Sequence, residues 1–131
     1  MIIIDTSVWI DYLGGFETSQ TRWLEQALST QRLGLTDLIL CELLQGVREE
    51  SQFDEVHHAM LEFEIFPMGG VELAVRSARN FRTLRARGYT IRKTIDCMIA
   101  TFCLVKDHLL LHNDSDFAPF EQVLGLRVIH P

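Results

Sequence analysis

The chain has 131 residues and a formal net charge of −6; 47% of its residues are hydrophobic and 23% are charged. This length predicts a single domain, residues 1–131, with a sizeable core, and the composition excludes a disordered or fibrous protein. No apolar run reaches the roughly 18 to 20 residues of a membrane span, and the first run lacks the basic residues of a signal peptide. We therefore expect a cytoplasmic protein.

The first nine residues combine a strand pattern with the start of a helix. Ile2–Ile4 is a run of β-branched apolar residues, which is typical of a buried parallel strand. The run ends at Asp5, and the hydroxyl residues Thr6 and Ser7 that follow suit the start of a helix. Because ligands of open α/β sheets bind at the carboxyl ends of the strands, this pattern places Asp5 at a potential site.

The rest of the chain alternates between helical and strand patterns. This alternation predicts a three-layer α/β/α sandwich with a mostly parallel central sheet of four to five strands. Helices are expected at residues 7–13, 18–29, 38–44, 48–62, 71–87, 95–106 and 119–124, and strands at 33–35, 65–66, 109–111 and 126–129. Thr94 is expected to cap the helix at residues 95–106.

Cysteine and tryptophan residues give weaker predictions. Cys41, Cys97 and Cys103 are odd in number and lack CxxC spacing, so we expect them to be reduced residues of the core. Trp9 and Trp23, on the early helices, are candidates for contact with a partner protein. His57 and His58 are adjacent rather than one helical turn apart, which favours a solvated surface over a metal site.

Five carboxylates occur in apolar segments, where an unpaired charge is costly to bury. Four of them have an ordinary explanation when taken singly: Asp96 as an acid of a first helical turn, Asp114 or Asp116 as a turn residue, and Glu42 as the partner of an arginine. If they converge, their mutual repulsion requires a cation, and oxygen ligands favour Mg²⁺ or Mn²⁺ over zinc. The predicted cluster consists of Asp5, Glu42, Asp96, Asp114 and Asp116.

A basic block lies between Glu72 and Asp96 and contains no acidic residue, although the whole chain is acidic. Guanidinium groups that recur at every third position predict a basic stripe on one helix, which would bind the phosphates of a nucleic acid. The alternative is an ordinary solvated helix face. The block comprises Arg76, Arg79, Arg82, Arg85, Arg87, Arg92 and Lys93.

Taken together, four segments resemble the PIN-domain ribonucleases, and specifically the VapC-type toxins of bacterial toxin-antitoxin pairs. The resemblance spans essentially the whole chain. It is carried by Ile2–Ile10, by the helix that contains Glu42, by Thr94–Ala100 and by Leu110–Phe117. One departure is His112, where many relatives carry threonine.

The resemblance implies an endoribonuclease that depends on Mg²⁺ or Mn²⁺, forms a homodimer and is neutralised by a VapB-type antitoxin. It implies catalytic roles for Asp5, Glu42, Asp96 and Asp114. It also implies metal binding by Asp5, Asp96, Asp114 and Asp116, with Thr6 or Ser7 positioning a water or a phosphate. The candidate substrate-binding residues are Ser7, Arg79, Arg82, Arg85, Arg92 and Lys93.

Two other function classes fit these residues less well. A non-catalytic PIN-like module that binds RNA or a protein should have lost one or more of the acids, whereas the set here is complete. A phosphatase that forms an aspartyl phosphate on Asp5 should have a second aspartate where Ser7 stands, and a receiver domain should have a lysine after Leu109–Leu111. The sequence therefore favours RNA hydrolysis, with no indication of which RNA is cut.

Overall fold

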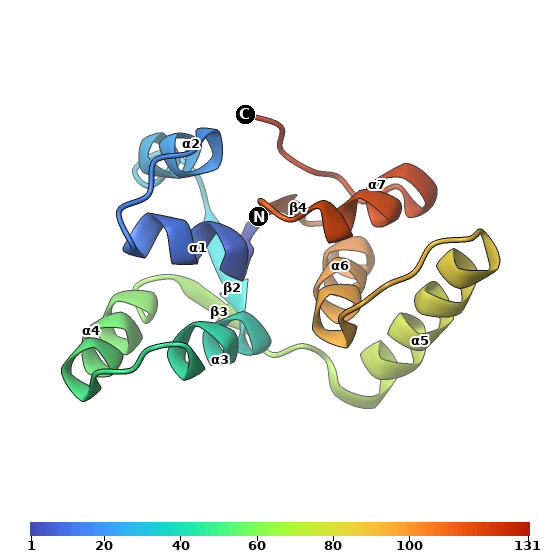
Figure 1. Cartoon of the computed structure of the whole chain (residues 1–131), viewed down its shortest axis with the longest axis horizontal. Coiled ribbons are helices and arrows are strands. Elements are labelled where there is room, and N and C mark those ends of the chain that lie inside the picture. The colour runs from blue at the N-terminus through green and yellow to red at the C-terminus, as the bar shows by residue number, and fades with distance from the viewer.

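A four-stranded parallel sheet lies at the centre of the computed structural model, which describes all residues, 1–131 (Figure 1). Its strands follow the spatial order β3-β2-β1-β4. In the register of the sheet, Ile2 pairs with Leu33 on one side and with Leu109 on the other. The strands are β1 (Ile2–Ile4), β2 (Leu33–Thr36), β3 (Glu64–Phe66) and β4 (Leu109–Leu111).

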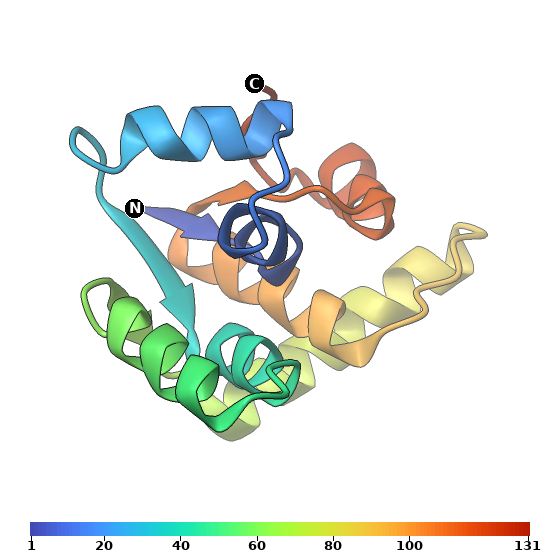
Figure 2. The same ribbon diagram turned by 60° about the vertical axis from the view of Figure 1, so that its left-hand side comes forward.

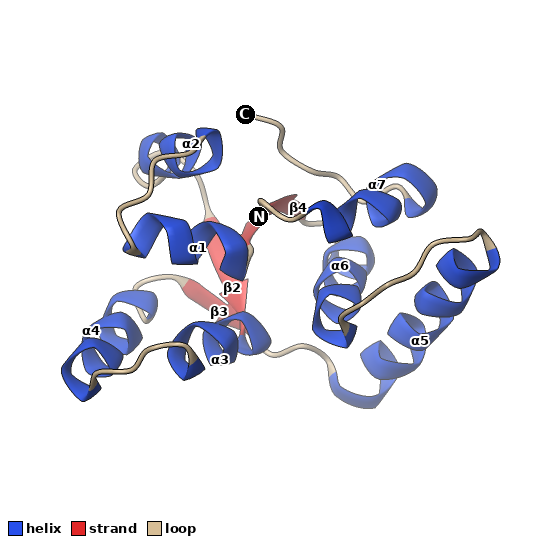
Figure 3. Cartoon of the chain, in the orientation of Figure 1, coloured by secondary structure: helices blue, strands red, loops and turns tan.

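Helices cover both faces of this sheet (Figure 3). Helices α1 (Thr6–Leu13), α2 (Ser19–Ala27), α3 (Asp37–Gln45) and α4 (Glu50–Met60) connect the first three strands and lie together in Figure 1. On the other side, α5 (Gly70–Ala86) and α6 (Thr94–Lys106) form the crossover from β3 to β4, and a 3₁₀ turn (Ser115–Phe117) leads into α7 (Ala118–Leu124). The predicted α/β/α fold class is confirmed.

The strand order reverses at β1. Strands β2 and β3 lie on one side of β1, whereas β4 lies on the other, after the chain has crossed back through α5 and α6. Figure 2 shows α5 and the connector that follows it extending from one side of the molecule. A reversal of strand order leaves a crevice at the carboxyl ends of the two strands concerned. Here those strands are β1 and β4, which end immediately before Asp5 and His112.

A single cluster of 26 buried hydrophobic residues forms the core. Trp9 is fully buried in it, with its ring 5.0 Å from that of Phe63, so the prediction that Trp9 contacts a partner is wrong. Cys97 and Cys103 are buried as expected, but Cys41 is exposed because it lies on the outer face of α3. No helix is long and apolar enough to cross a membrane.

One predicted strand and one predicted helix cap differ from the structure. The expected last strand, residues 126–129, is reduced to one isolated bridge between Leu110 and Val128. The helix expected to follow Thr94 begins at Thr94 itself, with Lys93 as its N-cap and no capping hydrogen bond from a side chain. The beginning of α6 therefore follows directly on the basic connector.

Candidate metal centre

Asp5 caps the helix that follows β1. Its backbone N–H extends the ladder of the sheet to the carbonyl of Leu111 (2.9 Å), and its Oδ2 accepts hydrogen bonds from the Ser7 backbone N–H (3.0 Å) and the Ser7 hydroxyl (2.7 Å). The side chain is only 3% exposed, and its other oxygen, Oδ1, is buried without any partner. The strand and the cap together hold one unsatisfied carboxylate oxygen inside the protein.

Burial raises the pKa of Asp5 to about 6, because the charged form loses its hydration. The nearby carboxylate of Glu42 raises this pKa further, while the hydrogen bonds from Ser7 oppose the shift. A cation beside a buried carboxylate stabilises its ionised form more than a cation beside an exposed carboxylate does.

Glu42 reaches the same region from α3. It lies in the middle of this helix, is half-buried, and accepts a hydrogen bond from the Thr6 hydroxyl to its Oε1 (2.7 Å). Thr6 directly follows Asp5, so this bond ties α3 to the end of β1. The arginine partner that would have explained Glu42 as an ordinary ion pair is absent from the salt bridges of the chain.

Asp96 lies in the first turn of α6 and is 5% exposed. Its Oδ2 is buried without a partner, as is Oδ1 of Asp5. Burial raises the pKa of Asp96 to about 7, and the charges of Asp5 and Asp114 add to this effect. The hydrogen bonds from Asp5 to Leu111 and from Asn113 to Ser7 place residues from opposite ends of the chain side by side here.

Asp114 and Asp116 complete the cluster from the turn after β4. The backbone N–H of Asp116 donates to Oδ1 of Asp114 (2.9 Å), which closes the turn. One carboxylate oxygen from each of Asp96, Asp114 and Asp116 lies within 4.8 Å of the others, an arrangement that could hold a metal ion. Asp5 is not a member of this triad but lies close enough to Asp96 to raise its pKa.

The donor set fits a hard divalent cation. All the converging groups are carboxylates, two of their oxygens are buried without a partner, and no cysteine or histidine belongs to the triad. Oxygen donors are the ligands that Mg²⁺ and Mn²⁺ prefer. The five acids singled out in the sequence are therefore brought into one region, and Asp114 and Asp116 both belong to it.

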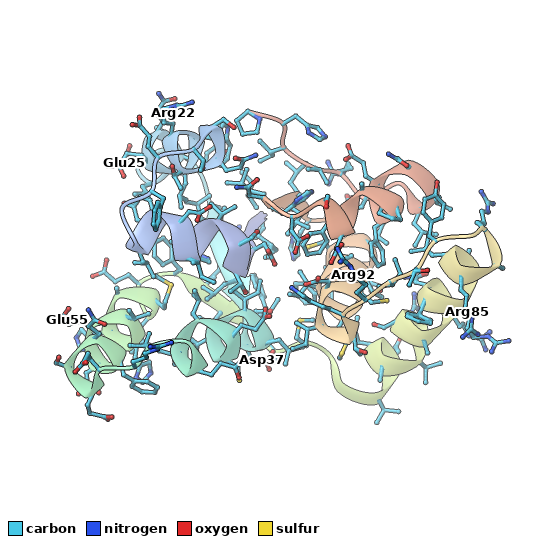
Figure 4. All side chains as sticks on the ribbon, in the orientation of Figure 1. Arg22, Glu25, Asp37, Glu55, Arg85 and Arg92 are labelled. Atoms are coloured by element: carbon cyan, nitrogen blue, oxygen red, sulfur yellow. The ribbon has the colours of Figure 1, made fainter.

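Two cations already contact this region. The Arg92 guanidinium pairs with Asp116 (2.8 Å), and the Lys93 ammonium lies 4.0 Å from Asp114. Both belong to the connector that precedes α6, and both are exposed. In Figure 4, Arg92 lies near the centre of the view, whereas Arg85 projects from the outer side of α5.

The arginines of α5 do not form a stripe on one face. Residues three apart fall about 60° short of a full turn, so three such steps carry the series half-way round the helix. Arg76 and Arg79 accordingly line one cavity beside α5. Arg82 and Arg85 line a different one. All four are exposed, and Arg76 also pairs with Glu72 (3.3 Å).

Two residues that the sequence did not single out as functional connect the acids. The backbone N–H of Asn113 donates to the Ser7 hydroxyl (2.9 Å), and the backbone N–H of Asp114 donates to Nδ1 of His112 (3.1 Å). The only proton of the Ser7 hydroxyl is used on Asp5, which favours a structural role for Ser7 over donation to a phosphate. The Asn113–Ser7 bond joins segments that are distant in the sequence, whereas the Asp114–His112 bond lies within one turn.

The PIN domain family model matches residues 2–122. The chain belongs to the PIN domain family. Two curated relatives are VapC ribonuclease Mb1587 of Mycobacterium bovis and ribonuclease VapC11 of Mycobacterium tuberculosis. Each is 28% identical to this chain, and each comparison covers 97% of this chain and 96% of the relative.

Solved structures share the PIN fold at lower identity. VapBC2 of Rickettsia felis, bound to a DNA fragment from its promoter, superposes with a TM-score of 0.78 at 18% identity and covers 98% of both chains. FitAcB of Neisseria gonorrhoeae gives a TM-score of 0.76 at 17% identity, covering 100% of this chain and 98% of the other. These structures support the fold that positions the acids.

Proposed function

We propose that this PIN domain is an endoribonuclease toxin that requires Mg²⁺ or Mn²⁺ and is neutralised by a VapB-type antitoxin in the cytoplasm. The observation that carries the proposal is the convergence of carboxylates from β1, α3, α6 and the turn after β4, two of them with a buried oxygen that no protein group satisfies. Similarity to VapC ribonucleases over nearly the whole chain supports it.

Asp5, Asp96 and Asp114 would hold the cation, with Asp116 as a further ligand. When bound, the cation would neutralise part of the clustered charge, lower the pKa of a water molecule and stabilise negative charge on a phosphodiester. Arg92, which pairs with Asp116, lies where it would contact an RNA phosphate bound at this site. In this proposal these four acids act mainly by binding the cation, rather than by reacting with the RNA themselves.

Glu42 is the best candidate to receive a proton from the attacking water. Thr6 fixes one of its oxygens, Oε1, whereas Oε2 accepts no hydrogen bond from the protein. Being half-buried, Glu42 remains accessible to water and substrate. A carboxylate held in this way can accept a proton without changing its position.

Substrate binding would use the basic connector rather than one face of α5. Arg92 and Lys93 lie beside the acids, so phosphates bound to them would be next to the reaction centre. Arg82 and Arg85 line the cavity that also includes Thr94, the first residue of α6, and could continue the path. Arg79 lies in the other cavity and is the weakest of the predicted substrate-binding residues.

The surface also offers a place for an antitoxin. A groove of about 790 Å³ lies between α1, α3 and α4, and Glu42 forms part of its wall. Ile10 is 55% exposed and Leu13 is 42% exposed at this groove, which suits an apolar segment of a partner. Two structural neighbours are a toxin-antitoxin complex and a member of a family of toxin-antitoxin systems. From the family resemblance we also propose that the protein forms a homodimer.

The nuclease proposal can be tested by incubating the purified protein with structured RNA and Mg²⁺ or Mn²⁺. We expect cleavage that EDTA abolishes and that Asp5→Asn and Asp96→Asn each reduce by at least a hundredfold, whereas the exposed Asp54→Asn control cleaves normally. RNA binding without cleavage would instead support the non-catalytic module. Equal cleavage by Asp96→Asn and the unsubstituted protein would contradict the mechanism.

The antitoxin proposal can be tested separately, by co-expressing the protein with the small open reading frame next to its gene. We expect a stable complex in which RNA cleavage is inhibited. Leu13→Asp should weaken this complex, whereas Val71→Asp, at an exposed apolar residue of α5, should not. A complex unaffected by Leu13→Asp would place the antitoxin elsewhere.

A further inference from the structure

His112 contacts the turn that carries two of the acids. Its Nδ1 accepts a hydrogen bond from the backbone N–H of Asp114 (3.1 Å), while the side chain of Asp114 accepts one from the backbone N–H of Asp116 (2.9 Å). The two bonds link His112 to Asp114 and Asp114 to Asp116, so they span the turn. They fix the backbone from which the carboxylates of Asp114 and Asp116 extend toward Asp96.

The ring of His112 is itself held in place. Its centroid lies 4.8 Å from that of the buried Phe117, and its Nε2 is buried without any partner. Since Nδ1 accepts a hydrogen bond, the hydrogen of the neutral ring must be on Nε2. The only polar contact of the ring is therefore the one to Asp114.

We propose that His112 is a positioning residue of the metal centre, whose Nδ1 holds the Asp114 backbone so that Asp114 and Asp116 face Asp96. The proposal rests on the proposed function in that it takes these acids as the cation site. Without the bond to Nδ1, the Asp114 N–H would be free to turn toward water, and the two carboxylates would lose their fixed separation from Asp96. A site whose ligands are less well fixed binds a metal ion more weakly.

Two substitutions separate the acceptor from the packing. His112→Phe keeps an aromatic ring against Phe117 but has no acceptor for the Asp114 N–H. His112→Asn gives up much of the ring contact but offers a side-chain oxygen, and asparagine commonly accepts a hydrogen bond from the N–H two residues further on. If His112 acts only by packing, His112→Phe should be the milder substitution. If it acts by positioning Asp114, His112→Asn should be the milder one.

The first measurements use the metal-free protein and do not depend on nuclease activity. Nitrogen-15 NMR of the histidine rings should show the hydrogen of His112 on Nε2. Hydrogen exchange of the Asp114 amide should be slow in the unsubstituted protein and in His112→Asn, and at least tenfold faster in His112→Phe. A hydrogen on Nδ1, or equal exchange in His112→Phe, would overturn the proposal whatever the enzyme does.

The second measurement is titration with Mn²⁺ by calorimetry. We expect His112→Phe to bind Mn²⁺ at least tenfold more weakly than the unsubstituted protein, and His112→Asn to restore most of this affinity. If the loss in His112→Phe came only from disturbed packing, His112→Asn would bind as weakly or more weakly, and the positioning role would be wrong. Mn²⁺ affinity unchanged in His112→Phe would also overturn it.

Discussion

The hydroxyl of Ser7 accepts a hydrogen bond of 2.9 Å from the backbone N–H of Asn113, which lies 106 positions further along the chain. The same hydroxyl donates to Asp5 at 2.7 Å. One side chain thus joins the end of β1 to the turn after β4, the two places where the sheet presents its acids. The geometry of the cluster depends on this link as well as on the sheet.

Replacing Ser7 by alanine removes both hydrogen bonds of its hydroxyl. We expect Ser7→Ala to lower the free energy of unfolding by about 1–2 kcal/mol, because Asp5 and Asn113 each lose a partner. Urea denaturation measures this change. The control is Ser19→Ala, since Ser19 is exposed on α2. A loss in Ser7→Ala no larger than in the control would show that the link contributes little.

Asp96→Asn should reduce cleavage at least a hundredfold yet stabilise the metal-free protein at pH 8. Burial and the charges of Asp5 and Asp114 make the ionised form of Asp96 unfavourable, and these effects raise its pKa to about 7. A neutral amide of the same shape removes that cost, so the melting temperature without metal should rise by several degrees. Asp54→Asn, on the exposed surface of α4, should change it little. An unchanged or lower melting temperature for Asp96→Asn would contradict the electrostatic account.

The stability of the metal-free protein should fall as the pH rises from about 4 to 8. The pKa of Asp5 is about 6 and that of Asp96 about 7 in the folded state, against 3.8 for an unperturbed aspartate. In this range the folded state binds more protons than the unfolded state, so the free energy of unfolding decreases with rising pH, by a few kcal/mol in total.

This pH dependence has two checks. Millimolar Mg²⁺ or Mn²⁺ should restore stability above pH 7, because the ionised acids then have a cation. Asp96→Asn should show a shallower decline than the unsubstituted protein, since one of the two groups no longer titrates. Denaturation followed at several pH values measures both, and a stability that increases from pH 5 to 8 without metal would be inconsistent with buried, unpaired acids.

Arg92 and Lys93 should contribute to RNA binding through charge. In the presence of EDTA, where no cleavage occurs, Arg92→Ala and Lys93→Ala should each weaken binding and reduce the slope of log K against log salt by about 0.7. Arg22→Ala, at an exposed arginine of α2, serves as the control (Figure 4). If all three variants bind RNA alike, the connector is not part of the substrate path.

Much of the fold could be predicted because its signals are local. The apolar runs at Ile2–Ile4 and Leu109–Leu111 identified the two strands that flank the site, and helix endings such as Gly88 were recognisable from residue type. The last strand was predicted wrongly because a short apolar run does not reveal that only one bridge forms. The burial of Trp9 was not predictable in the same way, because Trp9 packs against Phe63, which is distant in the sequence.

The sequence by itself determined which carboxylates are unusual, because Asp5, Glu42 and Asp96 interrupt segments that are otherwise apolar and an isolated charge there is costly. Only the tertiary structure decided how they are held. The Thr6–Glu42 and Ser7–Asn113 contacts depend on side-chain directions in space. Burial of an acid can be read from its neighbours in the chain, whereas a hydrogen bond between distant segments exists only once the sheet has brought them together.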